Sequence, residues 1–309
     1  MRSFGRASRA KSGHSLIASF TRRSANAKTC FNLGSYFLLI ACFYSCKSTV
    51  TKSPHLKVYV LDGGSFIFNN SLSWFTHGDE YNDYPRKTLA NPVFIIEHPK
   101  GRVIWDAGLD DKLADRDPEE IDTTAKLVTI LEEKLIDQLK SMNLTPDSID
   151  YLITSHTHFD HVGNANYFIN STWIIDKKEY EWAMSEEQRK SSSYYDSLRN
   201  SQTIQFEEKY DVFNDGKVVV YSTPGHTPGH MSLYIKLEES QSILLSGDLY
   251  HFNEQREYKR IPKFNTDSLQ TLDSMEKFEM LAKKLNARVI IPHEMTSYLD
   301  LPKYPEYLE

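Results

Sequence analysis

Four candidate metal ligands lie within six consecutive residues, His156-Thr157-His158-Phe159-Asp160-His161. The apolar run Tyr151–Ile153 precedes them and predicts a strand. Two histidines at alternate positions after a strand project to the same side. A helix that begins near Phe159 would place Asp160 and His161 one turn further on, where they can face a second ion. Imidazole and carboxylate groups are the ligands that zinc and similar cations prefer, so this segment predicts metal binding rather than a polar loop.

Three further candidates follow later apolar segments of the chain: His230, Asp248 and His293. Each comes at or just past the end of a predicted strand, where side chains from separate strands can converge. With the first segment they supply five histidines and two aspartates. This set is large enough to bind two ions that share one carboxylate and one hydroxide.

At this point the chain resembles the metallo-β-lactamase superfamily, from about Val58 to its end. The resemblance is carried by the motif His156-x-His158-x-Asp160-His161, followed in order by the three later candidates. Three segments are similar to the N-acyl-homoserine lactonase branch of that superfamily: Thr223–Ser232, Ser246–His251 and Lys178–Ala183. The resemblance implies an α/β fold in the form of a four-layer αββα sandwich, whereas the hydrophobic periodicity alone indicates only mixed helices and strands.

The resemblance also implies how the ligands divide between two divalent metal ions, for which zinc is the expected metal. One ion is held by His156, His158 and His230, the other by Asp160, His161 and His293, and Asp248 bridges both. A water shared by two such ions becomes a hydroxide that can attack a carbonyl. His226 is expected to hold its loop by hydrogen bonds rather than to bind metal. Asp106, just after a predicted strand, is expected to orient a ligand histidine.

The function implied is hydrolysis of a small-molecule lactone, foremost an N-acyl-homoserine lactone, with Asp160, Asp248 and His251 as the catalytic candidates. Lactonases of this branch often carry tyrosine where this chain has His251, three residues after the bridging aspartate. The imidazole can donate a hydrogen bond in its place, but the exchange leaves the exact substrate open.

The same ligand set also fits three other functions: a thioester hydrolase of the glyoxalase II type, a β-lactamase, or a non-catalytic metal-binding scaffold. Asp248 counts against the β-lactamase. The absence of a basic stretch after His293 counts against the glyoxalase. The complete ligand set counts against the scaffold.

Hydrophobic periodicity predicts the elements that position these residues. Leucines four residues apart predict a helix over residues 124–141, and further helices are predicted over 177–188 and 267–285. Residues 69–90 lack a period and predict a long loop, and residues 185–203 predict a polar insertion near the site entrance.

Aromatic residues cluster in and before the predicted loop: Phe66, Phe68, Trp74 and Phe75. They would either line an apolar pocket or pack beneath a surface loop.

The first 50 residues contain eight basic residues and no acidic one. The apolar run Tyr36–Tyr44 is too short to span a bilayer comfortably but fits the hydrophobic region of a secretory signal. Cys46 stands where a bacterial lipoprotein would be cleaved and lipidated. We therefore predict a leader over residues 1–46, a tether over 47–55 and a hydrolase domain over 56–309. The protein would be exported and membrane-anchored through the lipid, or periplasmic; the alternatives are an organellar transit peptide and a start codon placed too far upstream.

Cleavage at Cys46 would remove seven basic residues and change the formal net charge from −6 to −13. A strongly acidic domain argues against nucleic acid as a partner, because phosphate backbones require basic surfaces. No cysteine follows Cys46, so the folded domain can form neither a disulfide nor a thiolate–zinc bond. The composition, 40% hydrophobic and 25% charged, is ordinary for one sizeable core and gives no indication of oligomeric state.

Overall fold

A computed structural model describes residues 55–69, 72–81, 86–116, 119–122, 127–188 and 192–309. The leader prediction and Cys46 lie outside these residues, so the predicted division of the chain stays a prediction. Within the described part, none of the helices is both long enough and apolar enough to cross a bilayer.

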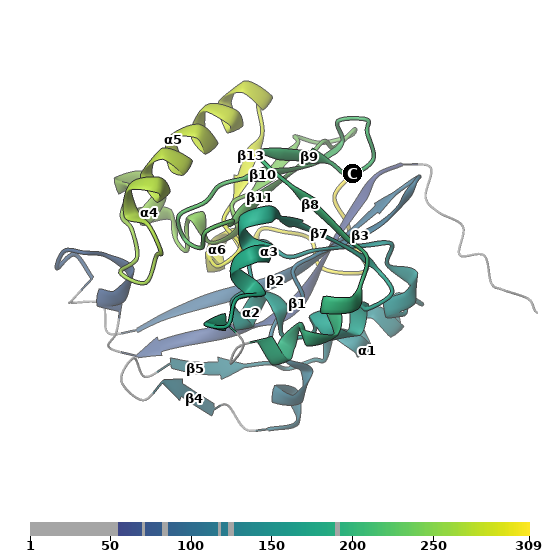
Figure 1. The fold of residues 1–309 in the computed structure, drawn as a ribbon, viewed down its shortest axis with the longest axis horizontal. Coiled ribbons are helices and arrows are strands. Elements are labelled where there is room, and N and C mark those ends of the chain that lie inside the picture. Colours follow the sequence, from purple (N-terminus) through teal and green to yellow (C-terminus); the bar gives the residue numbers. More distant parts are fainter. Residues whose placement is uncertain (1–54, 70–71, 82–85, 117–118, 123–126, 189–191) are drawn as a thin grey trace, which may run out of the picture. The chain divides into compact units, whose positions relative to one another are not determined.

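The described residues form two β-sheets (Figure 1). The larger sheet has the order β4-β5-β1-β2-β3-β6-β7-β8. Its central antiparallel pair is long, and β3, β6, β7 and β8 run parallel to one another. In sheet order the strands are β4 Glu119–Asp122, β5 Leu127–Ile130, β1 Lys57–Asn69, β2 Arg86–His98, β3 Gly101–Trp105, β6 Tyr151–Ile153, β7 Thr172–Asp176 and β8 Thr203–Phe206.

The smaller sheet has the order β13-β12-β11-β10-β9. Only its edge pair β12–β13 is parallel among the strands described. Its strands are β13 Arg288–Ile290, β12 Ile243–Leu245, β11 Met231–Ile235, β10 Val218–Ser222 and β9 Lys209–Asp211.

Alternate residues of the smaller sheet pack into two different clusters, as the period of a strand requires. Val218 and Val220 join the cluster that contains the strands of the larger sheet. Val219, between them, packs with Met275 and Phe278 of α5 (Ser268–Leu285) on the opposite face. Figure 1 shows α5 alongside this sheet.

The larger sheet is covered in turn by α1 (Leu135–Ser141), which contacts β1, and by α3 (Lys177–Ala183), which contacts β7. Helices, sheet, sheet and helix therefore stack in the order of a four-layer αββα sandwich, as predicted.

The predicted helix over 267–285 is confirmed. The Asp267 carboxylate accepts the Gln270 N–H at its start, and Asn286 adopts the left-handed conformation at its end with φ 49°. Leu269 in the first turn is 79% exposed, whereas Met275 further along the helix is buried. Three shorter helices complete the elements: α2 (Phe159–Val162), α4 (Asn253–Tyr258) and α6 (Met295–Leu299).

The predicted helix over 124–141 was wrong in its first half. Residues 127–130 form β5, which pairs with the end of β1, and only Leu135–Ser141 is helical. Leu127 and Thr129 are buried at alternate positions, so the leucine spacing fits a half-buried strand as well as a helix. Pairing with β1, which is distant in sequence, selects the strand over the helix.

Three other elements also differ from their predicted bounds. The first strand was expected to stop at the turn-forming pair Gly63-Gly64, but β1 continues through a register shift to Asn69. The second predicted helix ends at Ala183. Residues 192–200 pack on the core rather than forming a polar insertion, since Tyr195 and Leu198 are buried.

Candidate metal centre

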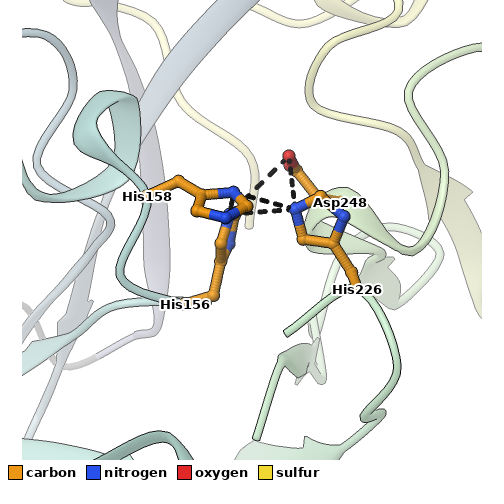
Figure 2. Close-up of side chains that lie close together, drawn as sticks. All are labelled: His156, His158, His226 and Asp248. Atoms are coloured by element: carbon orange, nitrogen blue, oxygen red, sulfur yellow. Dashed lines mark hydrogen bonds and ion pairs between the residues drawn. The ribbon is translucent and has the colours of Figure 1, made fainter. Parts of the chain in front are cut away.

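Three imidazoles from two separate loops meet at one point (Figure 2). His156 and His158 follow β6, and His226 follows β10. His226 Nε2 lies 3.2 Å from His156 Nε2 and 3.0 Å from His158 Nδ1, and the latter two atoms are 2.9 Å apart. Three ring nitrogens aimed at one another at these distances are arranged as the ligands of a shared cation are. We call these three residues the first group.

A second group lies beside the first. Asp160 and His161 stand in α2, and His293 follows β13. Asp160 Oδ2 lies 3.3 Å from His161 Nε2 and 3.5 Å from His293 Nε2. This second group therefore offers one carboxylate oxygen and two ring nitrogens at one point.

Asp248 stands between the two groups, as predicted. Its Oδ1 lies 3.2 Å from His161 Nε2 and 3.1 Å from His293 Nε2. Its Oδ2 lies 3.4 Å from His226 Nε2, on the side of the first group. Each carboxylate oxygen thus faces a different group, which is the arrangement of a bridging ligand. We refer to the two groups and Asp248 together as the metal centre.

In three of the ligand histidines, Nε2 faces the metal centre and is the inner nitrogen, while Nδ1 faces away from it and is the outer nitrogen. The partner of the outer nitrogen determines the tautomer of the ring. His161 Nδ1 donates to Asp106 Oδ2 at 3.0 Å, and His293 Nδ1 donates to the Ala90 carbonyl at 2.6 Å. His226 Nδ1 lies 2.9 Å from the side-chain oxygen of Asn265. Because these partners are acceptors, the proton stays on the outer nitrogen and the inner Nε2 keeps a lone pair for a metal.

Asp106 plays the predicted orienting role. It adopts the left-handed conformation with φ 59°, and its Oδ1 also accepts the Ser155 N–H at 2.5 Å.

Burial and charge make the residues fit two divalent cations. Burial holds the pKa of His156, His158 and His226 below its ordinary value, so these rings are neutral, as metal ligands must be. His161 Nε2 and Asp248 Oδ1 are buried and lie 3.2 Å apart, yet neither makes a well-aligned hydrogen bond among the described residues. Buried polar atoms are rarely left unpaired, and a pair of cations here would satisfy both.

The prediction that His230 binds metal and His226 holds the loop was wrong, because the structure reverses the two roles. His230 Nδ1 donates to the Thr223 carbonyl at 3.0 Å, and its Nε2 accepts the Asp248 N–H at 2.8 Å. Both ring nitrogens are therefore used inside the protein. A Cβ at Gly247, where φ is +54°, would lie 2.6 Å from His230 Nε2, so glycine is needed for this contact.

His251, the third catalytic candidate, lies at the edge of the metal centre. Its Nε2 is 3.2 Å from Asp248 Oδ2, and its ring stacks on His293 with the ring centroids 5.5 Å apart. Gln255, which the sequence analysis did not identify, accepts the His251 N–H through its side-chain oxygen at 2.7 Å. Its side-chain amide donates to the Phe75 carbonyl at 3.0 Å, which ties His251 to the 72–75 turn.

A pocket of about 270 Å³ opens onto Asp160, Asp248, His251 and His293. Six aromatic side chains line its other side, and we call them the aromatic wall: Phe66, Phe68, Trp74, Phe75, Phe159 and Phe264. Of the two alternatives for the first four, the structure supports pocket lining. Their rings pack largely edge to face, as Phe66 does on Phe159 at 5.9 Å.

A family model of the metallo-beta-lactamase superfamily matches residues 87–293. The chain belongs to this superfamily and is a metal-dependent hydrolase within it.

Sequence relatives of the chain belong to one branch of the superfamily, the N-acyl homoserine lactonases. Over 266 residues the chain is 31% identical to the N-acyl homoserine lactonase AttM of Rhizobium radiobacter, covering 82% of this chain and 98% of that one. It is 30% identical over 230 residues to the N-acyl homoserine lactonase AiiA of Bacillus thuringiensis subsp. kurstaki, covering 72% and 90%. The predicted resemblance to the lactonase branch is confirmed.

A solved structure of an N-acyl homoserine lactone hydrolase, with the product N-hexanoyl-L-homoserine at its catalytic metal center, has the same fold. The TM-score is 0.70 at 26% identity, and the similarity covers 81% of this chain and 98% of that one.

Proposed function

We propose that this enzyme hydrolyses the lactone ring of N-acyl homoserine lactones. The observation that carries the proposal is one pocket that joins the metal centre to the aromatic wall. A polar ring would lie on the metal centre and an apolar acyl chain along the wall, where each buried methylene contributes about 0.8 kcal/mol. The named lactonase relatives support this substrate class.

Two zinc ions would be held by the first group and the second group, with Asp248 shared between them. Such ions, when bound, polarise a carbonyl and lower the pKa of water. Asp160 lines the pocket, and its carboxylate can accept a proton from the attacking water and return it to the departing ring oxygen. Water adds to the carbonyl carbon, the ring C–O bond breaks, and an acyl homoserine is released.

His251 would contact the reacting ester. Its Nε2–H, beside Asp248 Oδ2, can donate to a substrate oxygen held at the metal centre. Such a hydrogen bond strengthens as negative charge develops on that oxygen.

A substrate panel tests the proposal. Purified protein of measured zinc content should hydrolyse acyl homoserine lactones faster than thioesters or β-lactams, and a chelator should abolish the activity. If thioesters or β-lactams are hydrolysed faster than every lactone by the zinc-loaded enzyme, the proposal fails.

We also propose that the chain is exported and anchored through a lipid on Cys46. The basic, acid-free leader and the apolar run before Cys46 support this location. Cys46→Ser should abolish labelling by a fatty-acid probe and release the protein from membranes. Labelling that survives the substitution, or delivery of the protein to an organelle, would contradict the lipoprotein.

A further inference from the structure

We infer that Glu179 is a positioning residue that joins the two histidine loops of the first group and thereby sets the affinity of that group for its cation. The inference rests on the proposed two-cation site. Glu179 lies in α3 and is 0% exposed, yet it belongs to neither group. A buried carboxylate needs a reason to be there, because burying an ionisable group is costly unless its oxygens are satisfied.

The contacts of Glu179 divide evenly between the two loops. Its Oε1 accepts the N–H and the hydroxyl of Thr157 at 2.8 and 2.9 Å. Its Oε2 accepts the Thr227 hydroxyl at 2.7 Å and the Gly229 N–H at 3.1 Å. One rigid carboxylate therefore fixes both loops.

These contacts lie next to the ligands of the first group. Thr157 stands between His156 and His158, and Thr227 directly follows His226. The spacing between the two loops determines whether the three inner ring nitrogens converge. A change at Glu179 should thus alter the relative placement of these histidines.

The site requires a carboxylate rather than an amide. All four partners are donors, and a carboxylate offers acceptor lone pairs on both oxygens. A glutamine of the same shape would turn an NH₂ group toward one pair of donors. The loop also passes close to α3, since a Cβ at Gly229 would lie 2.2 Å from the Glu179 nitrogen.

The second group has different supports. His161 is oriented by Asp106, and His293 by the Ala90 carbonyl. The Asp160 carbonyl accepts a hydrogen bond from the Asn91 side chain. Loss of Glu179 should therefore weaken one cation position and leave the other intact.

Zinc titration of the full chain against a competing chromophoric chelator tests the inference. For Glu179→Gln we expect one zinc bound with the affinity of the unsubstituted protein and the other bound about tenfold to a hundredfold more weakly. Glu181→Gln, at an exposed position of the same helix, is the matched control and should leave both affinities unchanged.

Thr227→Val covers the case in which Glu179→Gln does not fold, because it removes a single hydroxyl donor. It should weaken the same zinc by a smaller factor. A folded Glu179→Gln or Thr227→Val protein that binds both zinc ions with unchanged affinity, or loses both equally, would overturn the inference. The readout uses no substrate, so failure of the lactone panel with normal zinc binding would reject the proposed function alone.

Discussion

The metal centre and the aromatic wall face the same pocket but are built in opposite ways. In the metal centre, ligand side chains are held by second partners: Asp106 behind His161, Asn265 behind His226, and a backbone carbonyl behind His293. The wall is held by ring packing, and two of its members, Trp74 and Phe264, are 39% and 40% exposed. Hydrogen bonds of this kind fix the tautomer and orientation of a ligand ring, whereas apolar packing tolerates substitutions that keep the volume.

From this difference we expect the two regions to have separate functional roles. The metal centre should determine whether hydrolysis occurs, and the wall should determine which acyl chain binds. Substitutions in the metal centre should lower kcat or metal content, while substitutions in the wall should change KM and leave kcat nearly constant.

The largest effect is expected for Asp248→Asn. An amide offers one oxygen where the carboxylate offers two, so it cannot serve both groups. We expect kcat to fall by about a hundredfold or more. Steady-state kinetics with zinc analysis on the same sample measures this, and Asp273→Asn on the exposed side of α5 is the control. An Asp248→Asn enzyme with near-normal kcat would show that hydrolysis does not require a carboxylate shared by the two groups.

The next prediction separates the two histidines of the Pro-Gly-His repeat. His226→Asn should leave about one zinc per chain, because a ligand of the first group is lost. His230→Asn should keep both zinc ions but lower the free energy of unfolding by about 1–3 kcal/mol, because buried partners lose their hydrogen bonds. Elemental analysis and chemical denaturation distinguish them. The reverse pattern would restore His230 as the ligand.

His251 lies where the two regions meet, so His251→Phe sharpens the boundary between them. Phenylalanine keeps the ring packing on Phe75, whose centroid lies 5.0 Å away, but removes the N–H. We expect kcat for a lactone to fall by at least about tenfold while KM changes less. Rates at saturating and at low substrate separate the two constants. A variant that raises KM alone would make His251 a part of the wall.

The smallest effect is expected in the wall. Phe66→Ala should raise KM for long acyl chains by about fourfold for each methylene that loses its contact, and leave short chains unaffected. Leu299→Ala, at a position that is 68% exposed, is the control. Kinetics across a series of acyl lengths gives the slope of log KM against chain length. An equal loss for all lengths would show that Phe66 supports the site rather than the chain.

The sequence predicted the part of the site that is local. The first ligand motif occupies six neighbouring residues that run from the loop after β6 into α2, so chain geometry alone brings its side chains to one place. His226 and His230 could not be distinguished in this way, since each ends a Pro-Gly-His triplet. Their roles are set by residues distant in sequence, Asn265 behind one ring and Gly247 against the other.

The elements of the fold also differ in whether local or distant residues specify them. The helix over 268–285 is specified by its own period and caps. Residues 127–130 carry a leucine spacing that two structures can satisfy, and pairing with β1 selects the strand. Glu179 was visible only as part of a segment similar to lactonases, because its four donors come from two other loops.

The most direct test of the account is an anomalous diffraction experiment on crystals of the zinc-loaded protein with an acyl homoserine product. We expect two zinc peaks, one among His156, His158 and His226 and one among Asp160, His161 and His293. Asp248 should lie between them, and the acyl chain should lie along the aromatic wall. A single peak, or a peak coordinated by His230 Nε2, would contradict the account.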